Sequence, residues 1–269
     1  MGGKLNPKSD LPRNTALVTG AAGGIGSAIV RALGEHGVTV AAVDRAEARP
    51  DVLAEKARAD GLDVHAFTAD VSDERAVEAL LDDVERRLGG VGSLVNAAGV
   101  LRPGRAHTLS HEDWAGTFAV NATGVFLVSR AVVRRMLDAR RPGAVVTVAS
   151  NAAATPRTDM AAYAASKAAA TMFTKCLGLE VARHGIRCNI VAPGSTETPM
   201  LASLWREPSG RTGTLEGVAD EYRVGIPLGR IARPGDVADA VVYLLSDRAR
   251  HITLQSLTVD GGAALGVSA

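Results

Sequence analysis

The sequence predicts a doubly wound α/β fold, a single domain built on a seven-stranded parallel sheet. Short runs rich in β-branched residues alternate with longer, helix-length segments along the 269 residues. These runs are mostly apolar, as strands covered by helices on both faces of a sheet require. No repeat, low-complexity segment or linker divides the chain. We therefore expect residues 14–269 to form one domain behind a flexible tail at residues 1–13.

Seven runs predict the strands. In chain order they are residues 15–19, 38–43, 64–68, 93–98, 144–150, 186–192 and 256–260. The segments between them have helix length, which parallel strands need for their crossovers. The Ala-rich run after the fifth strand is expected to be one of these helices. The longest irregular segment, about 195–229, is rich in Gly, Pro, Ser and Thr. Because so long a loop in a compact domain is usually functional, we predict that it is a substrate lid.

Composition excludes several classes of function. The net charge is +1 and the basic residues are spread over the chain, which argues against a nucleic-acid surface. The N-terminus lacks an apolar signal region and no run of about 18 apolar residues occurs, so neither secretion nor membrane spanning is expected. Two cysteines, Cys176 and Cys188, form no disulfide pattern, which suits a reducing cytoplasm. The six histidines never stand at metal-ligand spacing, so we predict no metal.

The first predicted strand runs directly into TGAAGGIG, residues 19–26. Glycines here let the backbone approach a pyrophosphate, and the helix that follows offers free N–H groups and the positive end of its dipole. This placement between strand and helix predicts a dinucleotide site, with cofactor contacts from Gly20, Ala22, Gly24, Ile25 and Gly26.

Asp44 ends the second predicted strand, about 20 residues further on, where a carboxylate can accept hydrogen bonds from the adenosine ribose. Its charge would also repel a 2′-phosphate, and no basic residue stands in the glycine turn. NAD is therefore the expected cofactor. Arg45 leaves NADP open as the alternative, because an arginine at that position can bind the 2′-phosphate.

Tyr163 and Lys167 stand at i and i+4 in the Ala-rich helix, so they share one face. A free tyrosine has a pKa of about 10, and a general base at neutral pH needs its phenolate stabilised, which a lysine one turn away can do. A pair of this kind is often an ordinary surface pair, so its functional interpretation depends on the rest of the chain.

Together, TGAAGGIG, NAAG (residues 96–99), Asn121, Ser150 and YAASK (residues 163–167) resemble the short-chain dehydrogenase/reductase family from about Thr15 to the C-terminus. The resemblance implies a Rossmann fold, a homotetramer, and a catalytic tetrad of Asn121, Ser150, Tyr163 and Lys167. It implies that Asn121 holds a proton-relay water behind Lys167. Further cofactor contacts would come from Asp70 and Val71 beside the adenine, and from Asn96, Ala97, Ala98, Gly99, Tyr163, Lys167, Pro193, Gly194, Thr196 and Thr198.

Within that family, core and lid segments resemble the 2,3-dihydro-2,3-dihydroxybenzoate dehydrogenases of catechol siderophore biosynthesis. The similar segments are residues 96–104, 112–121, 144–157, 192–205, 225–234 and 251–266, whereas residues 207–224 depart from the pattern. The implied reaction is NAD-dependent oxidation of a carboxylated cyclohexadiene diol. Tyr163 and Ser150 would contact the substrate oxygen, and the carboxylate would need an arginine, for which Arg102, Arg157 and Arg206 are candidates.

Three alternatives remain open at this point. A 3-oxoacyl thioester reductase or a sugar alcohol dehydrogenase would carry the same tetrad, because one fold serves many oxidoreductions. A binding protein on the same fold would be expected to have lost Tyr163 or Lys167, and both are present.

Overall fold

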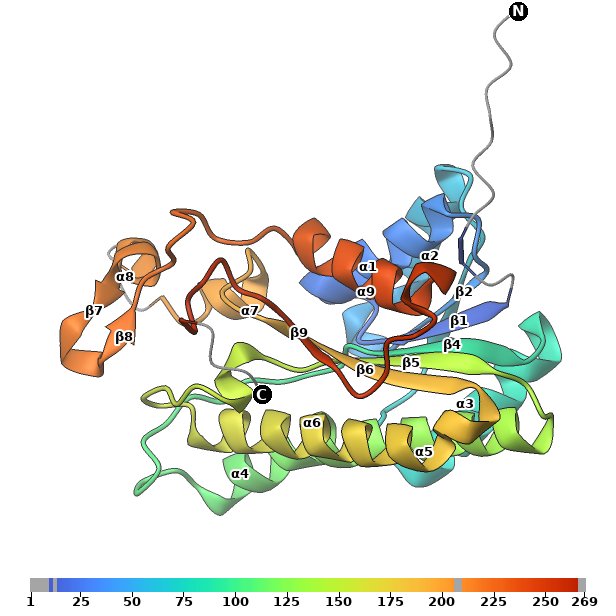
Figure 1. Cartoon of the computed structure of the whole chain (residues 1–269), viewed down its shortest axis with the longest axis horizontal. Coiled ribbons are helices and arrows are strands. Elements are labelled where there is room, and N and C mark those ends of the chain that lie inside the picture. The colour runs from blue at the N-terminus through green and yellow to red at the C-terminus, as the bar shows by residue number, and fades with distance from the viewer. Residues whose placement is uncertain (1–9, 12–13, 206–209, 266–269) are drawn as a thin grey trace, which may run out of the picture.

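The computed structural model describes residues 10–11, 14–205 and 210–265. Seven strands form one parallel sheet in the order β3-β2-β1-β4-β5-β6-β9 (Figure 1). Their bounds are β1 Thr15–Thr19, β2 Val40–Asp44, β3 Val64–Thr68, β4 Val91–Asn96, β5 Gly143–Val148, β6 Ile186–Pro193 and β9 Ser256–Val259. The predicted sheet and its seven strands are confirmed, and the strand ends differ from the prediction by at most two residues.

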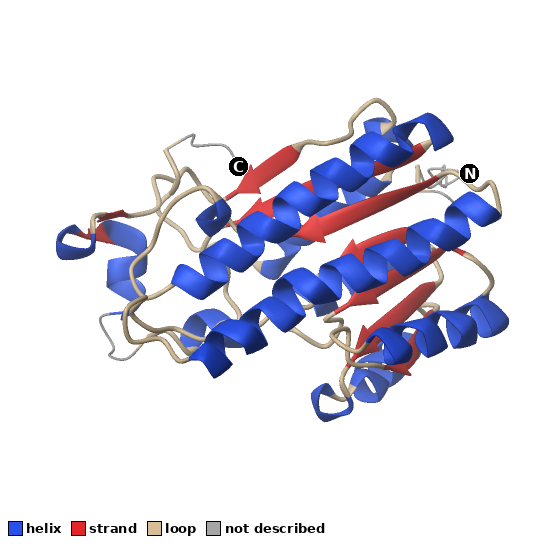
Figure 2. Cartoon of the chain, turned by 90° about the horizontal axis from the view of Figure 1, so that it is seen from below, coloured by secondary structure: helices blue, strands red, loops and turns tan. Residues whose placement is uncertain are grey.

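Helices cover both faces of the sheet (Figures 1 and 2). One layer consists of α1 Gly24–Glu35, α2 Pro50–Ala59 and α9 Pro234–Leu245. The other consists of α3 Glu74–Leu88, α4 His111–Phe118, α5 Val125–Asp138 and α6 Ala161–Val181. Single 3-10 turns occupy Ala46–Ala48, Asn151–Ala153, Ala182–His184, Ala219–Glu221 and Asp247–Ala249, and a π-helical turn, Ala119–Gly124, joins α4 to α5.

Alternate residues of the central strands enter different cores. Leu17 packs into the cluster beneath α3 and α5, whereas its neighbour Val18 packs into the cluster beneath α1 and α9. The same alternation places Leu94 on one side of the sheet and Val95 on the other. Both faces of the central strands are therefore dry, which is why their sequences are mostly apolar and why buried polar residues such as Ser93 and Thr147 are hydrogen-bonded.

Within the described residues, His111–Asp138 is long and apolar enough to cross a membrane by length and composition alone. Its most apolar window is 56% buried inside the domain, where α5 contacts β4, β5 and the helices beside it. A core helix of a globular domain passes the same test, so the stretch is explained by its packing.

The order of the strands creates the crevice in which the site lies. The chain runs outward from β1 to β3 and then crosses back to β4 on the other side of β1. The loops that follow β1 and β4 therefore leave toward opposite faces of the sheet. In open α/β sheets a ligand binds in this gap, at the carboxyl ends of the strands.

The predicted lid has more structure than its composition indicated. Its described part contains α7 Pro199–Ala202, α8 Gly210–Glu216 and a hairpin of β7 Gly217–Val218 with β8 Arg223–Val224. A small apolar cluster joins Leu201 and Ile226 of the lid to Ile231 and Ala263, and Trp205 packs against this cluster. The expectation of an irregular loop was wrong here, because helices of one or two turns and two-residue strands leave no periodic pattern to detect.

Candidate active site

The glycine turn after β1 is packed too tightly for side chains at two positions. Gly20 has φ +65°, and a Cβ there would lie 2.6 Å from Ala98 Cα in the loop after β4. A Cβ on Gly26 would lie 2.0 Å from the carbonyl oxygen of Gly20. No side chain of the described residues caps the first turn of α1, which starts at Gly24. The N–H groups of that turn can therefore bind an anion, and this donor set suits the pyrophosphate of a dinucleotide.

Two side chains hold the turn in place. The Asp44 carboxylate, at the end of β2, accepts hydrogen bonds from Ala22 N at 3.0 Å and Arg45 N at 2.8 Å. The Thr19 hydroxyl accepts from Ala97 N at 3.2 Å and Ala98 N at 3.3 Å, which joins the ends of β1 and β4. Each carboxylate oxygen of Asp44 keeps a further lone pair that can accept from a ribose hydroxyl.

The other predicted adenine-side residues differ in exposure. Asp70 is exposed after β3, and hydrogen bonds from the Ser72 hydroxyl and the Ser72 backbone lower the pKa of its carboxyl. Val71 is buried, and its side chain packs against Gly124. Asn96 is only 2% exposed, and its amide donates to the Ser129 and Thr147 hydroxyls. The Asn96 side chain therefore supports the sheet, while the backbone of Ala97 to Gly99 continues along the crevice.

Ser150 and Tyr163 meet at the end of β5. The Ser150 hydroxyl accepts from Ala152 N at 3.1 Å and caps the 3-10 turn that follows it. Burial raises the pKa of Tyr163, and a hydrogen bond with the Ser150 side chain opposes that rise. The two hydroxyls are thus placed to contact one oxygen of a ligand.

Lys167 lies one turn beyond Tyr163 on α6, as its spacing predicts. It is 5% exposed, and its Nζ donates to the Val148 carbonyl oxygen at 2.9 Å. The same Nζ lies 5.8 Å from the centroid of the Tyr163 ring. Burial lowers the pKa of Lys167 to about 8. The ammonium is therefore held beside the phenol in a poorly solvated position, where charge interactions are strong.

Asn121 lies fully buried in the π-helical turn between α4 and α5. Its side chain accepts from Val100 N at 2.8 Å and donates to Val100 O at 2.9 Å and Ser166 Oγ at 3.0 Å. A Cβ at Gly99 would lie 3.3 Å from Lys167 Nζ and 3.4 Å from Asn121 Oδ1. The missing side chain at Gly99 therefore leaves room between the amide and the ammonium. The π turn carries no signal in the sequence.

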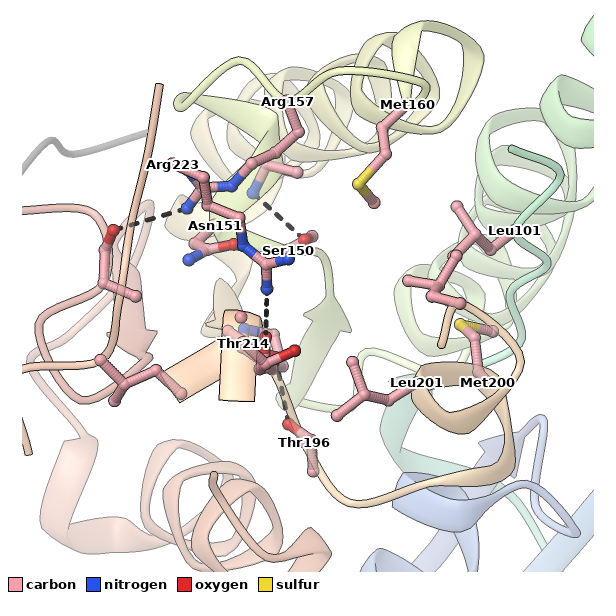
Figure 3. Close-up of a pocket in the computed structure, with 18 of the residues that line it drawn as sticks. Leu101, Ser150, Asn151, Arg157, Met160, Thr196, Met200, Leu201, Thr214 and Arg223 are labelled. Carbon is pink, nitrogen blue, oxygen red and sulfur yellow. Dashed lines mark hydrogen bonds between the residues drawn. The ribbon is translucent and has the colours of Figure 1, made fainter. Parts of the chain in front are cut away.

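A cavity of about 520 Å³ opens beside Ser150 and Tyr163 (Figure 3). Of the predicted cofactor contacts, it is lined by Ile25, Tyr163, Pro193, Gly194, Thr196 and Thr198. The loop after β6 reaches the glycine turn as well, because a Cβ on Gly24 would lie 2.6 Å from the Thr198 methyl group. The structure thus brings the two ends of the predicted cofactor site together. Among the described residues no group of three His, Cys, Asp or Glu could hold a metal.

The family model for short chain dehydrogenases matches residues 14–209. The chain belongs to the short-chain dehydrogenase family. It is therefore an oxidoreductase, and the glycine turn, the Asp44 carboxylate and the open start of α1 fit the nicotinamide cofactor of this family.

Similar proteins cover nearly the whole chain. A 2,3-dihydro-2,3-dihydroxybenzoate dehydrogenase of Bacillus subtilis (strain 168) is 53% identical over 94% of this chain and 96% of its own. One of the same name from Escherichia coli (strain K12) is 42% identical over 96% and 99%. Among solved structures, an actinorhodin polyketide ketoreductase with NADPH has a TM-score of 0.85 at 37% identity, covering 93% of this chain and 97% of that one.

The three predicted carboxylate-binding arginines have different surroundings. Arg157 lines the cavity, and its Nη2 donates to Ala263 O at 3.4 Å. Arg102 does not line it, because its guanidinium pairs with Asp113 on α4 at 3.2 Å. Arg206 lies outside the described residues.

A cationic residue that the sequence reasoning missed also lines the cavity: Arg223 on β8, whose Nη2 donates to Ser195 Oγ at 3.5 Å. It falls in the stretch that departs from the family pattern, so no motif marks it. Asn151 and Asp260 were missed as well. The Asn151 amide donates to the Asp260 carboxylate at 3.1 Å, which ties the end of β9 to the turn after Ser150.

Proposed function

We propose that this chain oxidises 2,3-dihydro-2,3-dihydroxybenzoate to 2,3-dihydroxybenzoate with NAD, in the biosynthesis of a catechol siderophore. The observation that carries the proposal is a cavity lined by Ser150, Tyr163 and Arg157. A hydroxyl-binding pair and a cation in one cavity suit a ring that bears both a secondary alcohol and a carboxylate. The names and the full-length coverage of the two bacterial relatives support the same substrate.

The chemistry follows from the positions of the tetrad residues. Ser150 would donate a hydrogen bond to the substrate oxygen while Tyr163, as phenolate, takes the hydroxyl proton. The C–H bond of the same carbon breaks as the C=O bond forms, and bound NAD supplies the hydride acceptor. The resulting ketone tautomerises to the catechol, and this aromatisation favours the oxidative direction.

Lys167 and Asn121 would support this proton transfer indirectly. Burial raises the pKa of Tyr163, so its phenolate needs a nearby positive charge, and the Lys167 ammonium is the cation beside its ring. Asn121 Oδ1 and Lys167 Nζ face the same gap at Gly99, which supports a relay water held between them. Asn121 also fixes the loop at Val100 through two backbone hydrogen bonds.

Asp44 supports NAD over NADP. Its carboxylate stands at the end of β2 and is held by the backbone of the glycine turn, where it would accept from the ribose and repel a 2′-phosphate. Arg45 lies next to it and is exposed, and its charge contributes to the lowered pKa of Asp70. We infer that Arg45 flanks the adenine side of the cofactor without providing a phosphate site.

A homotetramer in the cytoplasm belongs to this proposal. Large apolar side chains remain exposed on one helical layer, with Phe126 on α5 at 38% and Met172 and Leu179 on α6 at 59% and 72%. Covering these side chains in an assembly would remove them from water. The described cysteines, Cys176 and Cys188, are free thiols, which agrees with a reducing compartment.

The test is a substrate panel with the purified enzyme. The carboxylated dihydrodiol should give NADH with NAD and far less NADPH with NADP. A 3-oxoacyl thioester with reduced cofactor and a sugar alcohol with NAD should react slowly or not at all. Faster turnover of the thioester or of the sugar alcohol would replace the proposed substrate with that class.

A further inference from the structure

Two guanidinium groups converge in the wall of the cavity from separate parts of the fold. Arg157 belongs to the segment between β5 and α6, whereas Arg223 stands on β8 of the lid. Figure 3 shows both arginines on the Asn151 side of the cavity. Burial lowers the pKa of Arg157, and the positive charge of Arg223 lowers it further. The two guanidinium groups therefore repel each other.

Within the part of the chain that the structure describes, neither arginine forms a salt bridge with a carboxylate. Arg157 donates to a backbone carbonyl at 3.4 Å and Arg223 to a serine hydroxyl at 3.5 Å, both near the outer limit for a hydrogen bond. Arg135, on α5, shows the contrast, with its guanidinium 2.8 Å from Glu78 and 2.6 Å from Asp82. The two cavity arginines thus carry positive charge with only weak, neutral partners.

The nearby carboxylates do not fully neutralise the positive charges of Arg157 and Arg223. Asp260 acts on Arg157 through its charge, but its carboxylate already accepts from Asn151 Nδ2, Gly262 N and Ala264 N. Glu221 lines the cavity and is exposed to solvent. An anion between the two guanidinium groups would therefore gain two strong donors and relieve their repulsion.

The shape of the cavity indicates what that anion is attached to. Leu101, Met160 and Met200 line the side opposite the arginines, while Ser150 lies between the two sides (Figure 3). A flat ring can lie against the apolar side with one substituent toward Ser150 and another toward the cationic side. A carboxylate accepts bidentate hydrogen bonds from arginine, so it suits the cationic side.

The backbone of the lid holds Arg223 in this position. The hairpin pairs Val218 with Arg223, and Gly217 and Tyr222 adopt positive φ values of 93° and 52°. A Cβ on Gly225 would lie 2.1 Å from Leu215 O, so the chain after β8 lies directly against the end of α8. Arg223 is therefore presented by a packed hairpin, in contrast to a side chain on a loose loop.

We propose that Arg157 and Arg223 form a two-arginine clamp for the substrate carboxylate, with Arg223 as a specificity-determining residue delivered by the β7–β8 hairpin of the lid. The clamp rests on the proposed function for the identity of the ring. It goes beyond that function by assigning the second cation, and by linking the lid to the core through the bound ligand.

The experiment compares a carboxylated ligand with its neutral counterpart. Wild type, Arg223→Gln, Arg223→Lys and the control Arg230→Gln are assayed with the carboxylated dihydrodiol and with the dihydrodiol that lacks the carboxylate. Arg230 is a suitable control because it is exposed, pairs with Asp236 at 2.8 Å and does not line the cavity. Each variant is first checked for folding by circular dichroism.

Arg223→Gln should lower kcat/KM for the carboxylated compound by about 10- to 100-fold, mainly through KM, because a charge-assisted hydrogen bond is lost. It should leave kcat/KM for the neutral compound nearly unchanged. Arg223→Lys should fall between Arg223→Gln and wild type, and Arg230→Gln should match wild type. Equal losses on both compounds would overturn the clamp. If Arg223→Gln does not fold, Arg223→Lys serves as the test. An unchanged preference of this variant for the carboxylated compound would equally overturn the clamp.

A binding measurement separates failure of the clamp from failure of the proposed reaction. The NADH-saturated enzyme is titrated calorimetrically with 2,3-dihydroxybenzoate and with catechol. If the dihydrodiol is not turned over, but 2,3-dihydroxybenzoate binds more tightly than catechol and loses this advantage in Arg223→Gln, the clamp stands and the proposed reaction falls. If turnover proceeds and the variant binds both compounds as wild type does, the clamp falls and the reaction stands.

Discussion

Lys167→Ala tests whether the lysine charge makes Tyr163 a base. The structure places Nζ 5.8 Å from the centre of the Tyr163 ring, with both side chains shielded from bulk water. At an effective dielectric constant of about 20, an ammonium and a phenolate at that separation attract each other by about 3 kcal/mol. This energy corresponds to an approximately 100-fold larger phenolate population at a given pH. Removing the ammonium should therefore lower turnover near neutral pH by about 100-fold.

The assay is the pH dependence of kcat with saturating NAD and dihydrodiol. A positive charge favours the phenolate and lowers the pKa of the tyrosine, so its loss should move the rising limb of the profile to higher pH. Burial lowers the pKa of Lys167 itself to about 8, so the ammonium is present below that pH and is lost above it. The advantage of wild type over Lys167→Ala should accordingly be largest below pH 8 and narrow above it.

Lys167→Arg provides the matched control. Arginine keeps its proton throughout the accessible pH range, so above pH 8 an active arginine variant should keep its advantage over the alanine variant until the tyrosine of the alanine variant itself loses its proton. A Lys167→Ala profile that is lower than wild type but identical in shape would refute the electrostatic argument and leave Lys167 a role in cofactor binding alone.

Three further predictions concern the base, the cofactor and the lid. Tyr163→Phe should bind NAD with unchanged affinity in a calorimetric titration while losing nearly all turnover, and retention of a tenth of the wild-type rate or more would contradict the base assignment. Asp44→Ala should raise the KM for NAD by about 10-fold and improve the relative use of NADP, whereas a wild-type enzyme that already prefers NADP would contradict the role of Asp44. Hydrogen exchange of residues 196–225 should slow on substrate binding beyond the protection from NAD alone, and exchange indifferent to substrate would argue against closure of the lid.

The sheet was predictable because its strands are dry on both faces. In that setting every residue of a run such as residues 15–19 must be apolar or hydrogen-bonded, and the run stands out from its helical neighbours. Tyr163 and Lys167 were predictable for a related reason, since i and i+4 residues of a helix share a face in any fold. The glycine turn was predictable from its place between a strand and a helix.

Contacts between distant segments could not be predicted in this way. Arg102 and Arg157 are the same residue type in similar loops, yet Asp113 pairs with the first and no carboxylate among the described residues pairs with the second. Asn96 belongs to a cofactor motif, but its side chain supports the sheet. Arg223 lines the cavity from a hairpin whose strands have only two residues each, and strands so short leave no period in the sequence.

The measurement that tests the central claim most directly is the stoichiometry of the oxidation. Purified enzyme is incubated with NAD and a limiting amount of 2,3-dihydro-2,3-dihydroxybenzoate, with Tyr163→Phe as the parallel control. NADH is read by absorbance, and the aromatic product is quantified by chromatography and its catechol fluorescence. We expect one NADH and one 2,3-dihydroxybenzoate for each substrate molecule consumed by wild type, and neither with the control. No NADH, or NADH without the catechol, would contradict the proposed function.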